Sequence, residues 1–367
     1  MLNKIKDTKR CKICGAPLLI TREDKWGWRK NGTFVSAGER PNILISLDNL
    51  TAIFNELEEK LGKPIKKIIS ETKKQSTKRY VDGVISGFKG LLVRNRFLGK
   101  KALEKMIRTG RAVGYGDIWI EKLEWGKILT MCVRGAYFLP ELAGDVGGVT
   151  QSLWRKPVRI NLEEKNGIGK IMVESALAEE EVAKHLYPSP VLVLPGNITY
   201  EICPGCKIPK MVSETFEWDW PKGYLIHRKT GKRWVLLGRH GFNSLLQTLE
   251  RELGVGLSKL ILDIEKKCVK SEMCAKKEFV TADLKGTQED YQKLFNPQYF
   301  GLCGWGNPIE VEKREKVLGV KINNPFNDVI LAGMIAGIYE TIEGIDSEVQ
   351  WAPNTQGYFT VTVSPKL

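Results

Sequence analysis

The sequence repeats itself at a displacement of 192 positions. Cys11-Lys-Ile-Cys14 returns as Cys203-Pro-Gly-Cys206, and Trp26-Gly-Trp28 returns as Trp218-Asp-Trp220. The order, the spacing and the residue types are preserved together. A repeat of about 190 residues is far longer than the unit of a solenoid, so each copy is expected to fold around its own core.

The repeat continues along the chain with small changes of register. Gly114-Tyr115-Gly116 matches Gly304-Trp305-Gly306 at a displacement of 190, as expected if loop deletions separate two copies of one domain. We therefore predict two tandem homologous domains over residues 1–177 and 203–367, joined by a linker over 178–202. These domains are called the first and second halves below.

Composition predicts an ordinary soluble protein. Of the 367 residues, 42% are hydrophobic and 27% are charged, as is typical of globular chains. Residues 1–7 are too polar for a signal peptide, and no uninterrupted apolar run approaches the roughly 18 residues that a transmembrane helix needs. We expect a cytoplasmic location, where paired cysteines indicate metal or redox sites rather than disulfides.

Hydrophobic periodicity predicts an α+β fold with one element order in both halves. Each half begins with its CxxC motif and a β region, continues with helices, and ends in a β-β-α-β-β unit. In the second half we expect the elements of this unit at 309–314, 316–323, 326–344, 348–351 and 358–363. In the first half we expect them at 119–125, 127–134, 138–149, 158–162 and 170–175.

The helix of each unit is rich in small residues. Gly144 and Gly148 fall in the first, and Gly333 and Gly337 in the second. Glycine lowers helix propensity by about 1 kcal/mol relative to alanine, so its use in both halves indicates close packing. We expect these helices to pack against the sheet.

The second half resembles a known family, the 4-vinyl-reductase domain. The resemblance rests on four segments in the order β-β-α-β-β: Val317-Leu-Gly-Val-Lys-Ile-Asn-Asn-Pro, Ala332-Gly-Met-Ile-Ala-Gly-Ile-Tyr-Glu340, Val349-Gln-Trp351 and Phe359-Thr-Val-Thr-Val363. This α+β family is related in fold to the TRAPP vesicle-tethering subunits and to haem nitric-oxide-binding domains. The resemblance covers residues 290–364 and extends to the first half through the internal repeat.

What the resemblance implies is a small-molecule pocket between helices and sheet, in a sensor or accessory protein. Trp125, Trp305 and Phe326 are the candidate pocket walls for a small apolar ligand, although burial in the core would also explain these rings. Some family members carry a cysteine-rich zinc site late in the domain. The CxxC motifs here precede the domain, so those ligands do not carry over.

The cysteines predict a metal site that needs both halves. Zinc in a structural site takes four ligands, and each CxxC supplies two thiolates. Only the second half has further cysteines that could complete a four-cysteine site of its own. These are Cys268, Cys274 and Cys303, and the matching positions of the first half are Ser76, Asp82 and Val113. We therefore predict one shared zinc site near a pseudo-twofold axis, adding ~10 kcal/mol of apparent binding energy to the assembled state. Its ligands are Cys11, Cys14, Cys203 and Cys206.

Three other interpretations of the cysteines stay open. An iron–sulfur cluster uses the same four thiolates. Each CxxC could be a redox dithiol, although neither begins a helix that follows a strand, as thioredoxin-like chemistry prefers. The pairs could also be reduced and unliganded relics of a duplication.

Positive charge is concentrated between residues 63 and 100. This segment holds 11 Lys and Arg against 2 Asp and Glu, whereas 255–292 holds 7 of each. The basic residues recur at helical spacing beside apolar isoleucines, which predicts amines on the solvent side. Such a face would bind nucleic acid or an acidic partner protein, or would simply be solvated. The residues in question are Lys63, Lys66, Lys67, Lys73, Lys74, Lys78 and Arg79.

No catalytic motif is recognised. The chain contains neither a GxxxxGK[ST] phosphate loop nor an HExxH zinc motif. Of its three histidines, His185 lies in the linker, and His227 and His240 have no counterparts in the other half. We expect a non-enzymatic, zinc-containing binding or accessory protein that recognises a small apolar ligand or a partner complex. The alternatives are a nucleic-acid-associated protein using residues 63–100 and an iron–sulfur or redox accessory protein.

Overall fold

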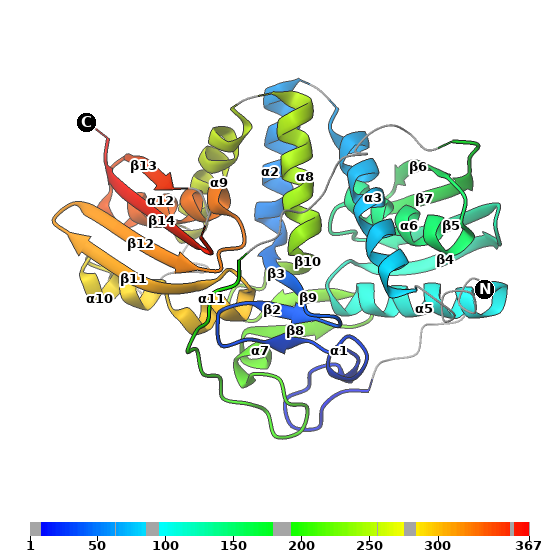
Figure 1. The fold of residues 1–367 in the computed structure, drawn as a ribbon, viewed down its shortest axis with the longest axis horizontal. Helices are drawn as coiled ribbons and strands as arrows, with labels where there is room; N and C mark the ends of the chain where they lie inside the picture. The colour runs from blue at the N-terminus through cyan, green and yellow to red at the C-terminus, as the bar shows by residue number, and fades with distance from the viewer. Residues whose placement is uncertain are drawn as a thin grey trace.

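The computed structural model describes residues 9–62, 64–85, 95–178, 192–254, 256–274, 284–352 and 356–366, in a mixed α+β fold (Figure 1). The first half contains α1 (Leu18–Arg22), β1 (Gly27–Trp28), β2 (Phe34–Ser36), β3 (Arg40–Ser46), α2 (Leu47–Leu61), α3 (Lys66–Val84), α5 (Arg96–Ala112), β4 (Asp117–Glu124), β5 (Ile128–Arg134), α6 (Leu139–Trp154), β6 (Val158–Lys165) and β7 (Ile168–Ser175). The second half contains α7 (Lys210–Thr215), β8 (Phe216–Asp219), β9 (Tyr224–His227), β10 (Arg233–Gly238), α8 (Arg239–Leu253), α9 (Leu257–Cys274), α10 (Gln288–Leu294), α11 (Pro297–Cys303), β11 (Asn307–Arg314), β12 (Val317–Asn323), α12 (Asp328–Glu343), β13 (Ser347–Ala352) and β14 (Tyr358–Pro365).

A six-stranded antiparallel sheet forms the centre of the molecule. Its strand order is β1-β2-β3-β10-β9-β8, so each half contributes one side. The halves meet where β3 pairs with β10, and Leu44 stands opposite Leu236 in that register. Helices α2 and α8 continue from these two strands and stand together above the sheet (Figure 1).

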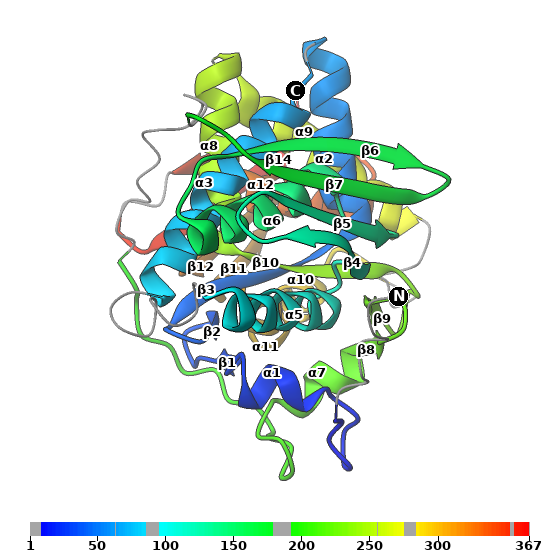
Figure 2. The ribbon, with the colours of Figure 1, turned by 90° about the vertical axis from the view of Figure 1, so that its right-hand side faces the viewer.

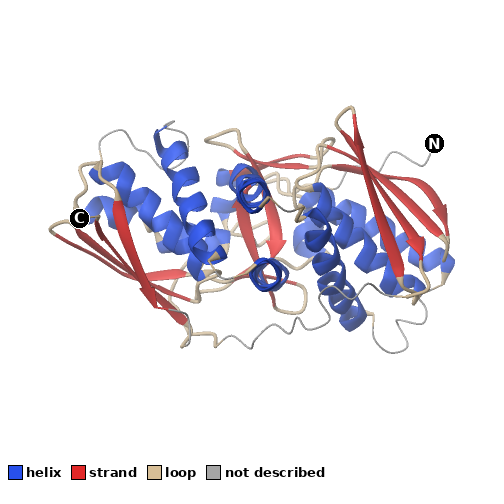
Figure 3. Ribbon diagram, turned by 90° about the horizontal axis from the view of Figure 1, so that it is seen from above, coloured by secondary structure: helices blue, strands red, loops and turns tan. Residues whose placement is uncertain are grey.

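Two four-stranded sheets lie at the outer sides of the molecule. Their strand orders are β4-β5-β7-β6 and β11-β12-β14-β13, which is the same topology in each half. Helix α6 packs on the inner face of one sheet and α12 on that of the other, and α3 and α9 pack on α6 and α12 (Figure 3). We call β4–β7 with α3, α5 and α6 the first lobe, and β11–β14 with α9–α12 the second lobe.

Each half packs its early elements against the lobe of the other half. Helix α2 contacts α9, and α8 contacts α3. The Trp28 indole donates to the Leu302 carbonyl over 2.9 Å, and the Trp218 indole donates to the Ala112 carbonyl over 3.0 Å. One continuous hydrophobic core therefore runs through both halves, in place of the separate cores expected from the repeat length. By these contacts Trp28 corresponds to Trp218 rather than to Trp220.

The glycines of α6 and α12 allow two helices to approach closely. A Cβ added at Gly144 would lie 2.6 Å from the Ser70 carbonyl oxygen, and one at Gly333 would lie 2.6 Å from that of Leu262. These contacts are to α3 and α9, so the expectation of packing against the sheet is wrong at these two positions. Only Gly147 meets the sheet, through Ile160.

The predicted elements of both β-β-α-β-β units are present, with ends that differ by a few residues. The largest difference is in α6, which continues to Trp154 and ends where Arg155 takes a left-handed φ of 55°. Within the described ranges, no helix combines the length and the apolar character needed to cross a bilayer.

Candidate metal centre and buried polar sites

The first CxxC motif is held in a tight turn. The Cys11 amide donates to the Ala16 carbonyl over 2.8 Å, and the Gly15 amide donates to the Cys11 carbonyl over 2.9 Å. Gly15 takes a φ of 75°, the left-handed conformation in which glycine meets no steric penalty. This turn directs both thiols to one side of the chain.

The second motif repeats the turn. The Cys203 amide donates to the Ile208 carbonyl over 2.8 Å, and the Lys207 amide donates to the Cys203 carbonyl over 2.9 Å. Lys207 takes a φ of 67° at the position of Gly15. The short helices α1 and α7 follow the two turns and lie at the same end of the molecule, below the central sheet (Figure 2).

The two turns bring four sulfur atoms together. The Sγ atoms of Cys11 and Cys203 are 3.8 Å apart, those of Cys14 and Cys206 are 3.3 Å apart, and all four lie within 4.8 Å of one another. Four sulfurs bound tetrahedrally to zinc at about 2.3 Å would be about 3.8 Å apart. Cysteine sulfur is also the ligand of structural zinc and of iron–sulfur clusters, so the donor set fits either group.

In each turn, hydrogen bonds from backbone amides lower the pKa of the first cysteine. The Cys14 amide is the main cause that lowers the pKa of Cys11, to about 7. Burial would raise the pKa of Cys203, but hydrogen bonds from the Cys206 and Gly205 amides outweigh it and lower that pKa. Burial raises the pKa of Cys14 and of Cys206. The four thiols therefore ionise unequally, and a bound cation would favour the thiolate form of Cys14 and Cys206.

Packing around the sulfurs is close on one side and open on the other. A Cβ at Gly205 would lie 2.9 Å from the Cys11 sulfur, so glycine is needed there. Cys203 is fully buried, whereas Cys14 borders a cavity of about 370 Å³ with Arg10 and Trp218. A small chelator can therefore reach the centre from the Cys14 side.

The four cysteines are the only metal-competent cluster in the part of the chain that the structure describes. Cys268 and Cys303 lie outside it, and the side chain of Cys274 is not among the described residues. The predicted group is thus brought together, while the identity of a metal remains a prediction.

The predicted basic face is only partly on the surface. Lys66 is exposed and forms an ion pair with Glu58 at 3.6 Å. Lys73 and Lys74 are buried, so the expectation of solvent-facing amines is wrong for these two. Of the remaining members, Lys63 lies outside the described residues, while Lys67, Lys78 and Arg79 are on α3, where Lys78 pairs with Asp82 at 3.2 Å.

Lys73 and Lys74 are internal because α3 packs against α6. The Lys73 ammonium lies 2.8 Å from the Glu141 carboxylate and 3.8 Å from that of Asp145. Burial would lower the pKa of Lys73, but the two carboxylates outweigh burial and raise it, so the lysine stays charged. The Lys74 ammonium contacts Glu71 and donates to the Val158 carbonyl over 3.3 Å.

Two tyrosines complete this buried cluster of the first lobe. The rings of Tyr115 and Tyr137 stack with centroids 4.3 Å apart, and burial raises the pKa of both phenols. The second Glu141 oxygen and the Tyr137 hydroxyl have no hydrogen-bond partner among the described residues. The sequence does contain a pattern that predicts the burial of Lys73. This lysine follows Ile65 and Ile69 at intervals of four residues, which places it on the apolar face of α3.

The corresponding region of the second lobe contains a small cavity of about 20 Å³. Trp305 and Phe326, both predicted as pocket walls, line it together with Trp234. Trp125 does not, because it packs on Gly99 of α5 and edge-on against Trp154 in the first lobe, with ring centroids 6.4 Å apart.

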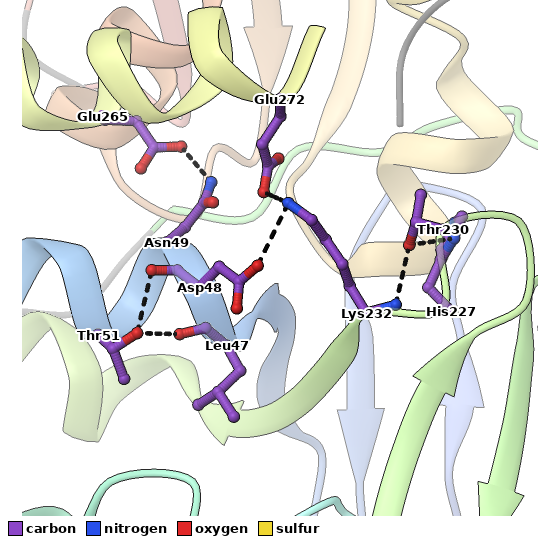
Figure 4. Close-up of polar contacts among 9 residues, drawn as sticks. All are labelled: Leu47, Asp48, Asn49, Thr51, His227, Thr230, Lys232, Glu265 and Glu272. Atoms are coloured by element: carbon purple, nitrogen blue, oxygen red, sulfur yellow. Dashed lines mark hydrogen bonds and ion pairs between the residues drawn. The ribbon is translucent and has the colours of Figure 1, made fainter. Parts of the chain in front are cut away.

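Polar groups from both halves also line this cavity (Figure 4). Ser46 and Asn49 come from β3 and α2, whereas Glu265 and Glu272 come from α9. The Asn49 amide donates to one Glu265 oxygen over 3.2 Å. Burial raises the pKa of Glu265 to about 8, and the nearby charge of Glu272 adds to this shift. The burial of Glu265 could have been predicted in the same way as that of Lys73, because this charged residue also lies on the apolar face of its helix, α9.

Glu272 is neutralised by a lysine from the central sheet. The Lys232 ammonium contacts Glu272 and lies 3.3 Å from the Asp48 carboxylate (Figure 4). Beside it, the Thr230 hydroxyl is 3.2 Å from His227 Nδ1, and burial lowers the pKa of His227 to about 4. That histidine is therefore neutral at physiological pH.

Comparison with known proteins adds no assignment to these sites. No protein-family description matches the chain, and no curated protein matches it.

Proposed function

We propose that the protein is a non-enzymatic binding or accessory factor whose two halves are clamped by one shared zinc ion. The observation that carries the proposal is the convergence of four sulfurs from two distant turns, all within 4.8 Å of one another. Cys11 and Cys14 would hold the ion from the first half, and Cys203 and Cys206 from the second. A structural zinc site of this kind stabilises the assembled state.

An internal duplication accounts for the arrangement. Leu44 and Leu236 are register partners 192 positions apart, and the cysteine pairs in contact are separated by the same interval. The two outer sheets have one topology. A pseudo-twofold axis through the β3–β10 pairing and the four cysteines would relate the halves, and both observations support it.

Small-molecule binding is the activity we propose for the lobes. The resemblance to 4-vinyl-reductase domains suggested a pocket between helices and sheet, and Trp305 and Phe326 line a cavity in the second lobe. In the first lobe the matching region is filled by the Lys73 cluster. The lobes would therefore have diverged, with the second retaining a ligand site.

Polyanion binding by residues 63–100 has less support. Two of the lysines on which it rests are internal, which removes their charges from the surface. Binding through the remaining basic residues of α3 is still to be tested. The salt dependence of binding to nucleic acid would test it.

Elemental analysis of protein purified without added metal tests the clamp. We expect one zinc per chain and no absorbance in the visible region. Iron with a visible band would favour a cluster on the same thiolates, because iron–sulfur centres absorb there and zinc does not. Protein free of both metals would overturn the clamp.

A further inference from the structure

We infer that the cavity of the second lobe binds an ammonium group, either the ammonium ion or the head of a small primary amine. The inference rests on the proposed small-molecule function and names the class of ligand. It is carried by three features: buried oxygen atoms without partners, a carboxyl group without a cation beside it, and a comparison with the first lobe.

Four polar atoms of residues that line the cavity have no hydrogen-bond partner in the described structure. Three are the oxygens Ser46 Oγ, Asn49 Oδ1 and Glu265 Oε2, whose residues are more than nine-tenths buried, and the fourth is a donor, the Trp234 indole N–H. The Asn49 amide nitrogen donates to Glu265, which leaves the amide oxygen of this side chain as an acceptor without a partner. Unpaired buried acceptors are costly, and a ligand rich in N–H donors would satisfy them.

Charge and ring chemistry also favour a cation. Glu265 forms no ion pair within the described ranges, whereas its neighbour Glu272 is paired with Lys232. The Trp234 and Trp305 rings lie nearly parallel, with centroids 5.9 Å apart and 22° between their planes. Indole faces attract ammonium groups, more strongly where water is excluded.

The first lobe places an ammonium of its own at the matching position. A Cβ at Gly144 of α6 would lie 2.5 Å from the Lys73 Cβ, and one at Gly333 of α12 would lie 2.9 Å from the Glu265 Cβ. Lys73 and Glu265 are thus equivalent positions, 192 residues apart.

The aromatic walls are equivalent as well. The Tyr137 amide donates to the Tyr115 carbonyl over 3.2 Å, and the Phe326 amide donates to the Trp305 carbonyl over 3.3 Å. The first lobe therefore holds a lysine ammonium between carboxylates and two rings. The second lobe has rings and the carboxyl group of Glu265 at these places and receives no ammonium from the described residues.

The size of the cavity limits the ligand. A volume of about 20 Å³ exceeds the roughly 10–15 Å³ that one water molecule needs. It admits a group of the size of ammonium, and a larger amine would have to leave its body outside the cavity.

The test uses the full chain as purified and follows its melting temperature in methylammonium chloride, against sodium chloride at equal ionic strength. We expect a saturable rise with methylammonium that is lost in Glu265→Gln. Glu348→Gln is the matched control, because Glu348 is an exposed glutamate on β13. Tetramethylammonium, which has a charge but no N–H donor, should give no saturable rise.

Three results would overturn the inference: no saturable rise in the wild type, an equal rise in Glu265→Gln, or an equal rise with neutral methanol. The first is expected if the cavity holds one buried water, which would satisfy the acceptors and the free Trp234 indole N–H together. The third would leave the proposed small-molecule function in place. Zinc content, measured on the same samples, reports on the clamp separately.

Discussion

Leu44 and Leu236 face each other across the β3–β10 pairing, and they are separated by the same 192 positions as Cys11 and Cys203. This antiparallel pairing joins the two halves at the middle of the six-stranded sheet. The same interval brings the two CxxC turns into contact at one end of the central sheet. We therefore expect interactions at this interface to contribute to the stability of both halves.

Removal of either CxxC pair should release all of the metal. Cys11→Ser with Cys14→Ser leaves two thiolates, which bind zinc far more weakly than four because a structural site needs four ligands. We expect zinc near zero per chain and a destabilisation of several kcal/mol, measured by elemental analysis and urea unfolding. Cys132→Ser is the control, since this cysteine lies on β5 outside the cluster. Retention of half the zinc would indicate two independent sites.

Gly333→Ala should weaken the packing of α12 on α9. The added Cβ would lie 2.6 Å from the Leu262 carbonyl oxygen, a contact that only a backbone shift can relieve. We expect a loss of about 1–3 kcal/mol in the free energy of unfolding. Gly83→Ala is the matched control, because that helical glycine has open space around it and should gain about 0.5–1 kcal/mol. Equal effects of the two substitutions would contradict the close helix approach.

Local patterns in the sequence predicted much of this structure, because they report short-range geometry. The β-β-α-β-β units follow from periodicity, and the shared cysteine group follows from counting two thiolates per half. The exchange of hairpins and helices between the halves was not predicted. It depends on the long-range pairing of β3 with β10. The sequence of neither strand indicates with which other strand it pairs.

The helix that contains Lys73 was predicted correctly, but the solvent exposure of the Lys73 side chain was predicted wrongly. Lysine is rarely buried unless it is paired, so helical spacing alone placed its amine in solvent. Its partners Glu141 and Asp145 are on another helix, four residues apart and thus on one face. The pairing of these helices decides the outcome, and single-sequence patterns do not report it.

Lys73→Ala should destabilise the first lobe strongly, and an added amine should restore stability. Removal of the ammonium leaves Glu141 and Asp145 buried without a cation, at a cost of about 3–5 kcal/mol. The n-propylammonium ion reproduces the atoms removed beyond Cβ and should raise the melting temperature of this variant more than that of the wild type. Lys66→Ala, at an exposed position on α3, should change stability by less than about 0.5 kcal/mol. Equal losses in the two variants would contradict the internal ion pair.

Glu265 should make the second lobe less stable as pH rises. Burial raises the pKa of this carboxyl from its ordinary value of 4.5 to about 8, so the folded chain keeps a proton that the unfolded chain loses. Stability is therefore full below the unfolded pKa and falls between about pH 4.5 and pH 8, with a total effect on the order of 5 kcal/mol. Glu272 and Cys268 lie near this carboxyl, and Lys232 contacts Glu272. All three are present in both the wild type and the Glu265→Gln variant, so their contributions cancel when the two are compared. The free energy of unfolding from urea titrations should drop more steeply with pH in the wild type than in Glu265→Gln, and parallel curves would show that Glu265 is ionised in the folded chain.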